Sequence, residues 1–436
     1  MLEGIAFSLV GLSFKVFGQP ANLGTIQLSN WQNAAVFTLP PEPDPEAEKI
    51  LQQYLKNLAA KGLPPGNQGI WLQSEITKLG THQGTVPISA ASITKIATTL
   101  ASLEKWSPEH RFETGIYSTG EIKNGVLQGD LIFSGSGDPL FVWEEAIAVG
   151  NALNKMGIRK VTGNLVVTPN FFMNYESNPQ IAAQQLRQGL NSATWNRGIV
   201  IQHALMPKGT PRPQIAIATS IKVQPNFPEN AKLLFRHQSM DLTQILKQMN
   251  VYSNNHIAQM LADLVGGANV VSQLAAQAAD VPENEIQLIN GSGLGVENRI
   301  SPRASVAMLI AIDNKLKSQP IGVTELFPVA GKDKKGTMIA RKIPNGTAVK
   351  TGTLNAVSAL VGVMPTRDRG QVWFAILNQG GSLVEFRAQQ DQLLQNLAQE
   401  WGVAPLTQTA TTSKPAFFGD PERNLIKKIG SETSSF

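Results

Sequence analysis

The stretch ISAASITKIATTLASLEKW, residues Ile88–Trp106, contains two serines that are each followed by a lysine three positions later. The pairs are Ser92 with Lys95 and Ser102 with Lys105. The apolar residues of the stretch recur at helical spacing, so we expect a helix in which the members of each pair share one face. A serine beside a neutral lysine can act as a nucleophile with its base, so this stretch links the fold to a possible chemistry.

The position of each pair along the expected helix separates them. Ser92 lies at the start, directly after an expected loop, where a free N–H and the positive end of the helix dipole would stabilise an oxyanion. Ser102 lies near the far end, where the dipole opposes negative charge, so we expect it to be an ordinary solvated residue. For Lys95 to act as a base it must be neutral near pH 7, which requires burial or a neighbouring cation.

Composition bounds the classes of function. The chain has 436 residues, 42% of them hydrophobic and 16% charged, which predicts a globular protein of about two domains. The net charge is +5 without a Lys/Arg-rich run, which argues against nucleic acid as a partner. Because the chain has no cysteine, disulfides, thiolate chemistry and cysteine-ligated zinc are excluded. The five scattered histidines form no H-E-x-x-H pattern, so we predict no metal site.

The order of the predicted elements indicates one domain inserted into another. A helix is expected from Pro45 with Asp44 as its cap, followed by a strand at GIWLQSE. Strands and turns dominate from about residue 108, with a hairpin at Asn124-Gly125 and one helix from about Val142 to Met156 that ends at Gly157. Short strands and polar loops continue to about Arg236, and helical spacing returns near residue 239. The stretches 346–364 and 370–379 are each expected to be one strand, and a helix is expected over Leu383–Trp401. The pattern predicts an α/β (α+β) fold: a sheet with helices on both faces and a strand-rich inserted domain.

The expected boundaries follow from these changes in pattern. The main domain would comprise residues 30–107 and 239–404, and the inserted domain residues 108–238. Residues 405–436 are polar and are expected to form a loose tail. Residues 1–29 would be either a weak export signal or an apolar segment that packs on the fold.

Two further short motifs carry polar groups that such chemistry would need. YSNNHIA places Ser253 and Asn255 two positions apart between two helical segments, although alone it would be read as a helix N-cap. VKTGT would be a plain edge strand by itself; its alternation predicts Lys350 and Gly352 on one face, and Thr351 and Thr353 on the other. The combination of the three motifs in this order is typical of penicillin-binding proteins and class A β-lactamases.

With these motifs the sequence resembles the class C low-molecular-mass penicillin-binding proteins, which are D-alanyl-D-alanine carboxypeptidases and endopeptidases. The resemblance covers about residues 30–400 and includes FSGSGDPLF, INGSGLGVENRISP and LFPVAGKDKKGTMIAR. It implies the penicillin-binding-protein/β-lactamase-like serine transpeptidase fold, an antiparallel sheet with helices on both faces. Three positions depart from the usual family pattern: Asn254 gives S-N-N in place of S-D-N, Asn290 replaces Asp and Gly295 replaces Ser.

The resemblance also implies roles for the motif residues. Ser92 would be the nucleophile, activated by Lys95, with the N–H groups of Ser92 and Thr353 as the oxyanion hole. Ser253 would relay a proton to the leaving amine, and Asn255 would bind the substrate's peptide. The third motif would complete the site: Lys350 would lower the pKa of Lys95 and bind the substrate's carboxylate with Thr351 and Thr353, while Gly352 would allow close approach.

The implied substrate is the D-Ala-D-Ala end of a peptidoglycan stem peptide, with β-lactams as covalent inhibitors that acylate Ser92. No metal or organic cofactor is required. Because peptidoglycan lies outside the cytoplasmic membrane, the expected location is the periplasm or cell envelope. Two alternatives remain open: a β-lactamase or esterase with the same serine chemistry, and a non-catalytic peptidoglycan-binding protein.

Overall fold

The computed structural model describes residues 43–75, 77–226, 228–404 and 417–426. The predicted export segment, the predicted start of the main domain at residue 30, and residues 405–416 and 427–436 of the predicted tail lie outside the described residues. No helix of the described part is long and apolar enough to cross a membrane.

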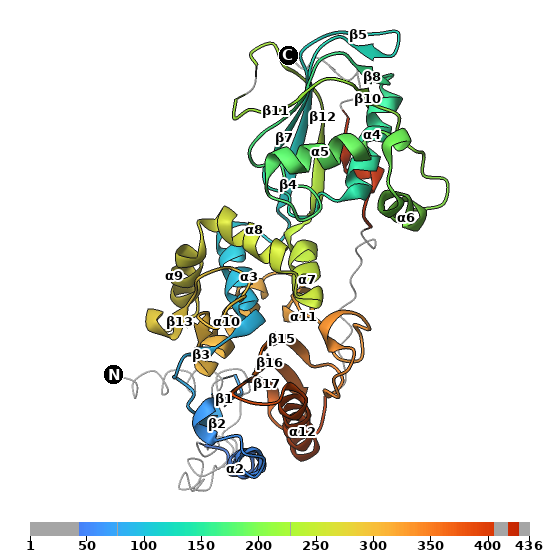
Figure 1. Cartoon of the computed structure of the whole chain (residues 1–436). Helices are drawn as coiled ribbons and strands as arrows, with labels where there is room; N and C mark the ends of the chain where they lie inside the picture. Colours follow the sequence, from blue (N-terminus) through green and yellow to red (C-terminus); the bar gives the residue numbers. More distant parts are fainter. Residues whose placement is uncertain (1–42, 76, 227, 405–416, 427–436) are drawn as a thin grey trace, which may run out of the picture. The chain divides into compact units, whose positions relative to one another are not determined.

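A five-stranded antiparallel sheet forms the centre of the main domain (Figure 1). Its strand order is β15-β16-β17-β1-β2. The strands are β15 (Ala348–Leu354), β16 (Val357–Thr366), β17 (Gly370–Gln379), β1 (Gln68–Gln73) and β2 (Lys78–His82). Since β15 is an edge strand, the motif residues 350–353 lie at the border of the sheet.

Strand β16 shows why both faces of this sheet are covered. Successive side chains of a strand point to opposite faces, and here both sets are apolar. Ala359 and Val361 pack into one buried cluster, whereas Leu360 and Met364 pack into another. A strand that is apolar on both faces needs a layer of helices on each side.

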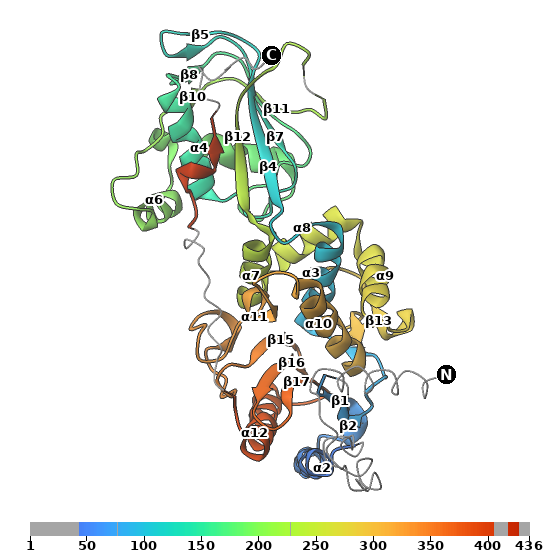
Figure 2. The ribbon, with the colours of Figure 1, turned by 180° about the vertical axis from the view of Figure 1, so that it is seen from behind.

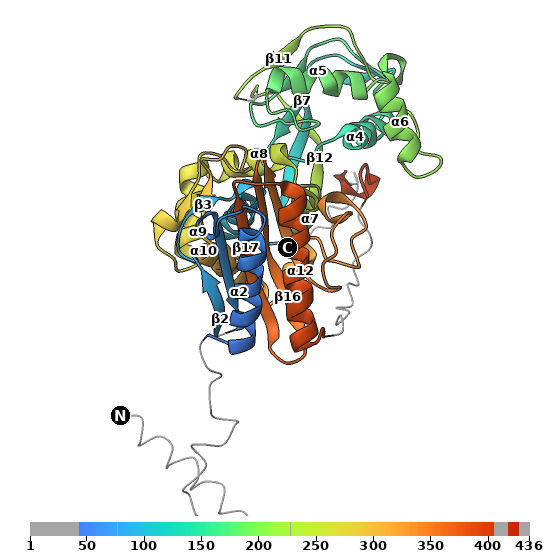
Figure 3. The ribbon, with the colours of Figure 1, turned by 60° about the horizontal axis from the view of Figure 1, so that its bottom comes forward.

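The helices supply these two layers. On one face, α2 (Pro45–Ala59) and α12 (Leu383–Trp401) lie side by side (Figure 3). On the other face lie α3 (Thr94–Lys105), α10 (Pro302–Leu316) and their neighbours α7 (Leu242–Tyr252), α8 (Asn255–Val265), α9 (Ala268–Ala278) and α11 (Val323–Leu326). The predicted sheet with helices on both faces is confirmed, as is the Asp44 cap of α2, whose carboxylate accepts from the N–H groups of Glu46 and Ala47.

The stretch 346–364 was expected to be one strand, and this prediction is wrong. It forms the hairpin β15-β16, with seven residue pairs from Ala348↔Val363 to Leu354↔Val357. The turn contains Asn355 and Ala356, and Ala356 has a positive φ of 56°. Alanine rarely adopts this left-handed conformation, so the sequence carries no strong turn signal at this point.

Residues 111–241 form a second set of sheets around their own buried cluster. A six-stranded mixed sheet has the order β11-β9-β7-β4-β12-β18, in which β18 is Asn424–Leu425. Strands β4 and β12 pair over most of their length (Figure 2). Its strands from this segment are β4 (Arg111–Ser118), β7 (Leu131–Gly135), β9 (Leu165–Val167), β11 (Ile221–Val223) and β12 (Lys232–Asp241). A four-stranded sheet comprises β5 (Ile122–Lys123), β6 (Val126–Leu127), β8 (Lys160–Val161) and β10 (Ala216–Ile217).

The predicted hairpin at Asn124-Gly125 joins β5 and β6, and both residues have positive φ, 49° and 81°. The predicted helix after residue 142 is α4 (Trp143–Lys155). The sequence predicted only strands and loops after α4, but α5 (Pro179–Gly189) and α6 (Arg197–Leu205) also form there. Both begin with an asparagine cap, Asn178 and Asn196, a signal that the sequence analysis did not use.

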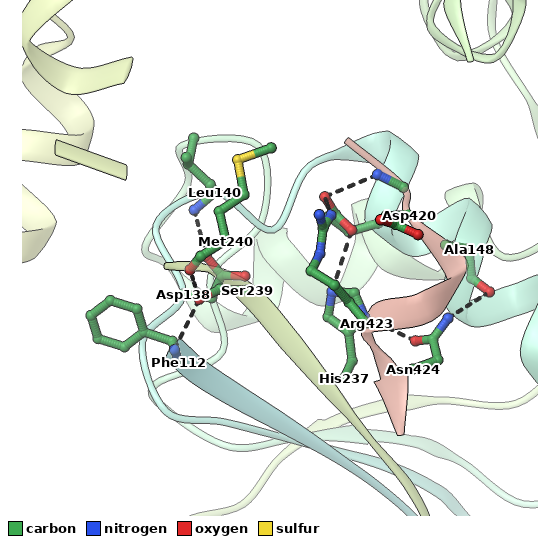
Figure 4. A network of polar contacts seen from close by, with 12 residues as sticks. Phe112, Asp138, Leu140, Ala148, His237, Ser239, Met240, Asp420, Arg423 and Asn424 are labelled. Carbon is green, nitrogen blue, oxygen red and sulfur yellow. Dashed lines mark hydrogen bonds and ion pairs between the residues drawn. The ribbon is translucent and has the colours of Figure 1, made fainter. Parts of the chain in front are cut away.

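The end of the described chain returns to this second sheet. The 3-10 turn η8 (Pro421–Arg423) leads into β18 (Asn424–Leu425), which pairs with β12 at Arg236 and His237. Arg423 forms a buried ion pair with Glu145, and the side chain of Asn424 is hydrogen-bonded to His237 at 2.8 Å (Figure 4). The prediction of a loose tail is therefore wrong for residues 417–426, because buried charges of the inserted segment need these partners.

Candidate active site

A short strand and a 3-10 turn position Ser92. Strand β3 (Ile88–Ser89) pairs with β14 (Arg299–Ile300), and the turn η4 (Ala91–Ile93) then leads directly into α3. Ala91 has a positive φ of 47°, which turns the chain sharply before the nucleophile. Ser92 is half-buried at the start of the helix, where the sequence predicted it.

Lys95 lies one turn further along and is fully buried. Its Nζ lies 3.0 Å from Ser92 Oγ, 2.7 Å from Asn255 Oδ1 and 2.6 Å from the carbonyl oxygen of Ser292. Burial lowers the pKa of Lys95 from 10.5 to about 7. The lysine can therefore be neutral near neutral pH.

The hydrogen bonds of Lys95 fit this neutral state. A neutral amine has two N–H bonds and one lone pair, and two of its three neighbours are oxygens that can only accept. The amine can donate to Asn255 and Ser292 and still accept the hydrogen of the Ser92 hydroxyl. This arrangement is the one that a general base for Ser92 requires.

The second motif lies at the junction of α7 and α8. Ser253 ends α7 in the left-handed conformation, with φ 53° and ψ 41°, and Asn255 is the first residue of α8. The side chain of Asn254 between them accepts from the N–H groups of His256 and Ile257. The N-cap interpretation is thus correct for Asn254. Because aspartate and asparagine cap helices about equally well, S-N-N retains the local structure expected of S-D-N.

Lys350 is fully buried on β15 and faces the second motif. Its Nζ lies 3.0 Å from Ser253 Oγ and donates to the carbonyl oxygen of Thr351 at 2.8 Å. Burial lowers the pKa of Lys350 well below its usual value, and the positive charge of Lys95 lowers it further. The sequence analysis gave burial or a neighbouring cation as the cause of a low pKa for Lys95, and in the structure the cause is burial. Since repulsion between two ammonium groups is mutual, protonation of either lysine disfavours protonation of the other.

The side chains of β15 after Lys350 contact different partners. A Cβ added to Gly352 would lie 2.8 Å from the carbonyl oxygen of Ala90, so this position brings the strand against the nucleophile segment. Thr351 Oγ1 is hydrogen-bonded to Thr337 Oγ1 at 2.7 Å, and Thr353 Oγ1 accepts from Arg387 Nη2 at 2.9 Å. Arg387 and Thr337 were not among the predicted site residues.

The sequence analysis also missed the role of the INGSGLG segment, which supplies a backbone acceptor. Asn290 Oδ1 accepts from the N–H groups of Ser292 and Gly293 at 3.1 and 2.8 Å, which fixes the loop that aims the Ser292 carbonyl at Lys95. Asn290 Nδ2 also donates to the carbonyl oxygen of Leu294 at 2.6 Å, a bond that the usual aspartate could not donate. No side-chain pattern reveals a carbonyl contact of this kind.

The second serine–lysine pair has a different environment from the predicted one. Ser102 is fully buried, and its hydroxyl donates to the carbonyl oxygen of Thr98 at 2.7 Å. The prediction that Ser102 is solvated is wrong, because α3 is buried on nearly all sides and a serine can satisfy its hydroxyl within the helix. Lys105 donates to the carbonyl oxygen of Leu264.

The site therefore contains two pairs of a serine hydroxyl and a buried lysine: Ser92 with Lys95, and Ser253 with Lys350. Ser92 with Lys95 can perform acyl transfer, and Ser253 with Lys350 can deliver a proton. Among the described residues, no group of three or more histidine, aspartate or glutamate side chains is arranged to hold a metal ion.

Comparison with known proteins extends this picture. Residues 52–212 and 198–400 match the profile of the D-Ala-D-Ala carboxypeptidase 3 (S13) family. The D-alanyl-D-alanine carboxypeptidase DacB of Haemophilus influenzae is 24% identical over 408 residues, covering 71% of this chain and 84% of the relative. The Carboxypeptidase Rv3627c of Mycobacterium tuberculosis is 25% identical over 348 residues, covering 68% and 72%.

Solved structures share the fold. The peptidoglycan endopeptidase Bd3459 of Bdellovibrio bacteriovorus superposes with a TM-score of 0.69 at 23% identity, covering 82% of this chain and 98% of that one. Penicillin binding protein 4 (dacB) of Haemophilus influenzae superposes with a TM-score of 0.59 at 20% identity, covering 79% and 98%. The expected penicillin-binding-protein-like fold is confirmed.

Proposed function

Because the chain belongs to the D-Ala-D-Ala carboxypeptidase 3 (S13) family, a family of serine peptidases, we propose that it cleaves the D-Ala-D-Ala end of peptidoglycan stem peptides through an acyl-enzyme on Ser92. The observation that carries this proposal is the position of Lys95 Nζ. It lies 3.0 Å from Ser92 Oγ, while two acceptor oxygens occupy its remaining hydrogen bonds.

In the acylation step, the hydroxyl proton of Ser92 passes to the lone pair of Lys95. Ser92 Oγ attacks the carbonyl carbon of the penultimate D-alanine, and the carbonyl oxygen becomes an oxyanion. The backbone N–H groups of Ser92 and Thr353 stabilise this oxyanion. Asn255 both accepts a hydrogen bond from Lys95 and is exposed enough to bind the substrate's peptide.

In the second half of the step, the C–N bond breaks and the leaving amine needs a proton. Ser253 Oγ donates it and is reprotonated from the Lys350 ammonium, which lies 3.0 Å away. After the amine departs, Lys95 carries the Ser92 proton and Lys350 is neutral, so a proton passes from Lys95 to Lys350 through solvent and restores both lysines. Water then attacks the ester on Ser92 with Lys95 as the base. The proton that Lys95 takes from water goes to Ser92 Oγ as the ester C–O bond breaks, which regenerates the free enzyme. No step requires a metal or an organic cofactor.

Substrate binding itself prepares the base in this scheme. The terminal carboxylate binds beside Lys350, Thr351 and Thr353, and its negative charge favours the protonated form of Lys350. A charged Lys350 repels a proton on Lys95, so the base becomes neutral when the substrate is bound. The low pKa that burial gives both lysines makes this exchange possible near neutral pH.

The same site accounts for β-lactams as covalent inhibitors, because their strained amide mimics the D-Ala-D-Ala bond. A penicillin G acylated form of the endopeptidase Bd3459 has been solved, which supports acylation of Ser92 in this chain. The peptidoglycan substrate implies the periplasm or cell envelope as the location. We also propose residues 30–107 and 239–404 as the catalytic domain and residues 108–238 as the inserted domain. One buried apolar cluster lies wholly within residues 116–235, and a second lies wholly outside this range.

Intact-protein mass after incubation with benzylpenicillin tests the proposal, with D-alanine release from a stem-peptide mimic measured in parallel. We expect a stable gain of one penicillin mass that Ser92→Ala abolishes together with D-alanine release. Rapid turnover of the antibiotic would favour the β-lactamase alternative. Peptide binding without acylation or release would favour the non-catalytic peptidoglycan-binding alternative.

A further inference from the structure

We propose that Arg387 of α12 is a substrate-binding residue that recognises the carboxylate of the leaving D-amino acid together with Thr353. The inference rests on the proposed function, because it concerns the same site and the same substrate. Arg387 belongs to none of the three sequence motifs, and it lies 34 positions after Thr353 in the chain.

The contact between the two residues determines that the Thr353 hydroxyl oxygen acts as an acceptor toward Arg387. Thr353 Oγ1 accepts a hydrogen bond from Arg387 Nη2 at 2.9 Å. The hydroxyl hydrogen of Thr353 is then available to donate, and among the described residues no protein group accepts it. Because Thr353 is exposed at the end of the edge strand, this hydrogen is available to a ligand.

Lys350 is poorly suited to be the lasting positive charge for a carboxylate. It is fully buried, and its hydrogen bonds go to Ser253 and to the carbonyl oxygen of Thr351. A lysine that gives up its proton during the reaction loses its charge when the leaving residue departs. A guanidinium stays charged throughout and can bind a carboxylate with two parallel N–H bonds.

Most N–H donors of the Arg387 guanidinium have no acceptor among the described residues. No carboxylate of the described residues lies within ion-pairing distance of it, whereas Arg341 and Arg369 of the same domain are paired with Asp391 and Asp44. The Arg387 side chain is exposed, and within the described part of the chain it makes one hydrogen bond, to Thr353. An arginine with five donors and a single protein partner can bind an anionic ligand.

The position of Arg387 over the strand is fixed by a buried contact one helical turn away. Gln390 is fully buried, and its Nε2 donates to the carbonyl oxygen of Ser358 at 3.1 Å and to Asn378 Oδ1 at 2.7 Å. Ser358 is the cross-strand partner of Thr353 in the β15-β16 ladder. The helix and the strand end are therefore held in one register, which places Arg387 beside Thr353 without relying on a mobile loop.

The test compares substrates with and without the carboxylate. We would measure kcat and KM for an acylated tripeptide ending in D-Ala-D-Ala and for its C-terminal amide, using wild type, Arg387→Gln and Arg387→Lys. Arg367→Gln is the matched control, because Arg367 is exposed and pairs with its neighbour Asp368. Acylation rates with benzylpenicillin and its methyl ester supply a second pair of ligands that differ in the carboxylate.

We expect Arg387→Gln to lower kcat/KM for the free acid by about 10- to 100-fold, as loss of a charge-assisted hydrogen bond predicts, mainly through KM. The kcat/KM for the amide and the acylation rate with the ester should change less than about twofold. Arg387→Lys should recover part of the loss that Arg387→Gln causes on the free acid. Arg367→Gln should have the kinetic constants of wild type.

The inference would be overturned if Arg387→Gln left two ratios as they are in wild type. These are the ratio of kcat/KM for the free acid to kcat/KM for the amide, and the ratio of the acylation rate with benzylpenicillin to the rate with its methyl ester. An equal loss on all four ligands with a lower unfolding temperature would also overturn it, because it would indicate a structural role. If wild type neither releases D-alanine nor becomes acylated on Ser92, the proposed function itself fails, and this inference fails with it.

Discussion

A Cβ placed on Gly352 would lie 2.8 Å from the carbonyl oxygen of Ala90, and 3.2 Å from the Cβ of Ala91. The edge strand of the sheet and the segment before the nucleophile are therefore in backbone contact. This contact fixes the distance between Ser92 and the strand that carries Lys350.

Gly352→Ala should therefore lower the rate of acylation by benzylpenicillin by at least about tenfold, because a backbone atom cannot move aside as a side chain can. Acylation kinetics measured by mass spectrometry would check this. Gly66→Ala is the matched control, since its nearest neighbour would be Gln83 Nε2 at 3.9 Å. Equal acylation rates for the two variants would contradict the expectation.

The rate of acylation should depend on pH through Lys95. Because the base must be neutral and its pKa is about 7, the rate should fall about tenfold per pH unit below that value and level off above it. Stopped-flow measurement with a chromogenic β-lactam from pH 5 to 9 would show this limb. A limb centred near 10 would mean that Lys95 is charged in the free enzyme and is not the base.

The same buried lysine should affect stability. The folded-state pKa of Lys95 is about 7 and the unfolded value is 10.5, so between these pH values the unfolded chain binds more protons. The free energy of unfolding of wild type should thus rise with pH over this window relative to Lys95→Met. Urea titrations at pH 7 and 9.5 would test this, and parallel pH dependence of the two proteins would rule it out.

In the second motif, Asn254 should act as a helix cap, whereas Asn255 should act in the site. Asn254→Asp should keep both stability and acylation, whereas Asn254→Ala should cost about 1 kcal/mol of unfolding free energy. Asn255→Ala should slow acylation by at least about tenfold, because it removes an acceptor of Lys95. Denaturant unfolding and acylation rates for the three variants would decide. A large loss of acylation in Asn254→Asp would show that the middle position has a role beyond capping.

Arg423 should be important for stability although it lies near the end of the chain. Arg423→Met leaves the buried carboxylate of Glu145 without its cation, which costs about 3–5 kcal/mol in comparable buried pairs. The double variant with Glu145→Gln should recover part of this loss, as a double-mutant cycle by urea unfolding would measure. If the single variant were as stable as wild type, the ion pair would contribute nothing.

Features that depend on local sequence were predictable. The Asp44-Pro45 start of α2, the hairpin at Asn124-Gly125 and the extent of α12 each follow from caps, turn residues or periodicity. The placement of Ser92 before α3 follows from the change between loop and helical spacing.

Features that depend on tertiary contacts were not predictable in the same way. The carbonyl of Ser292 contributes no side chain, so its bond to Lys95 has no direct signature in the sequence. Burial of Ser102 depends on how many elements surround α3, and the approach of Arg387 to Thr353 depends on how α12 lies across the sheet. The left-handed Ala356 lacks the glycine or proline that usually marks a turn.

The return of β18 to β12 has a consequence for exchange of parts between relatives. The inserted segment is not a self-contained module, because one strand of its sheet comes from the far end of the chain. In a chimera that received only residues 108–238, Glu145 would lack its ion-pair partner Arg423, and His237 would lack its hydrogen-bond partner Asn424. Grafting of this segment onto another member of the family would have to carry residues 417–426 with it.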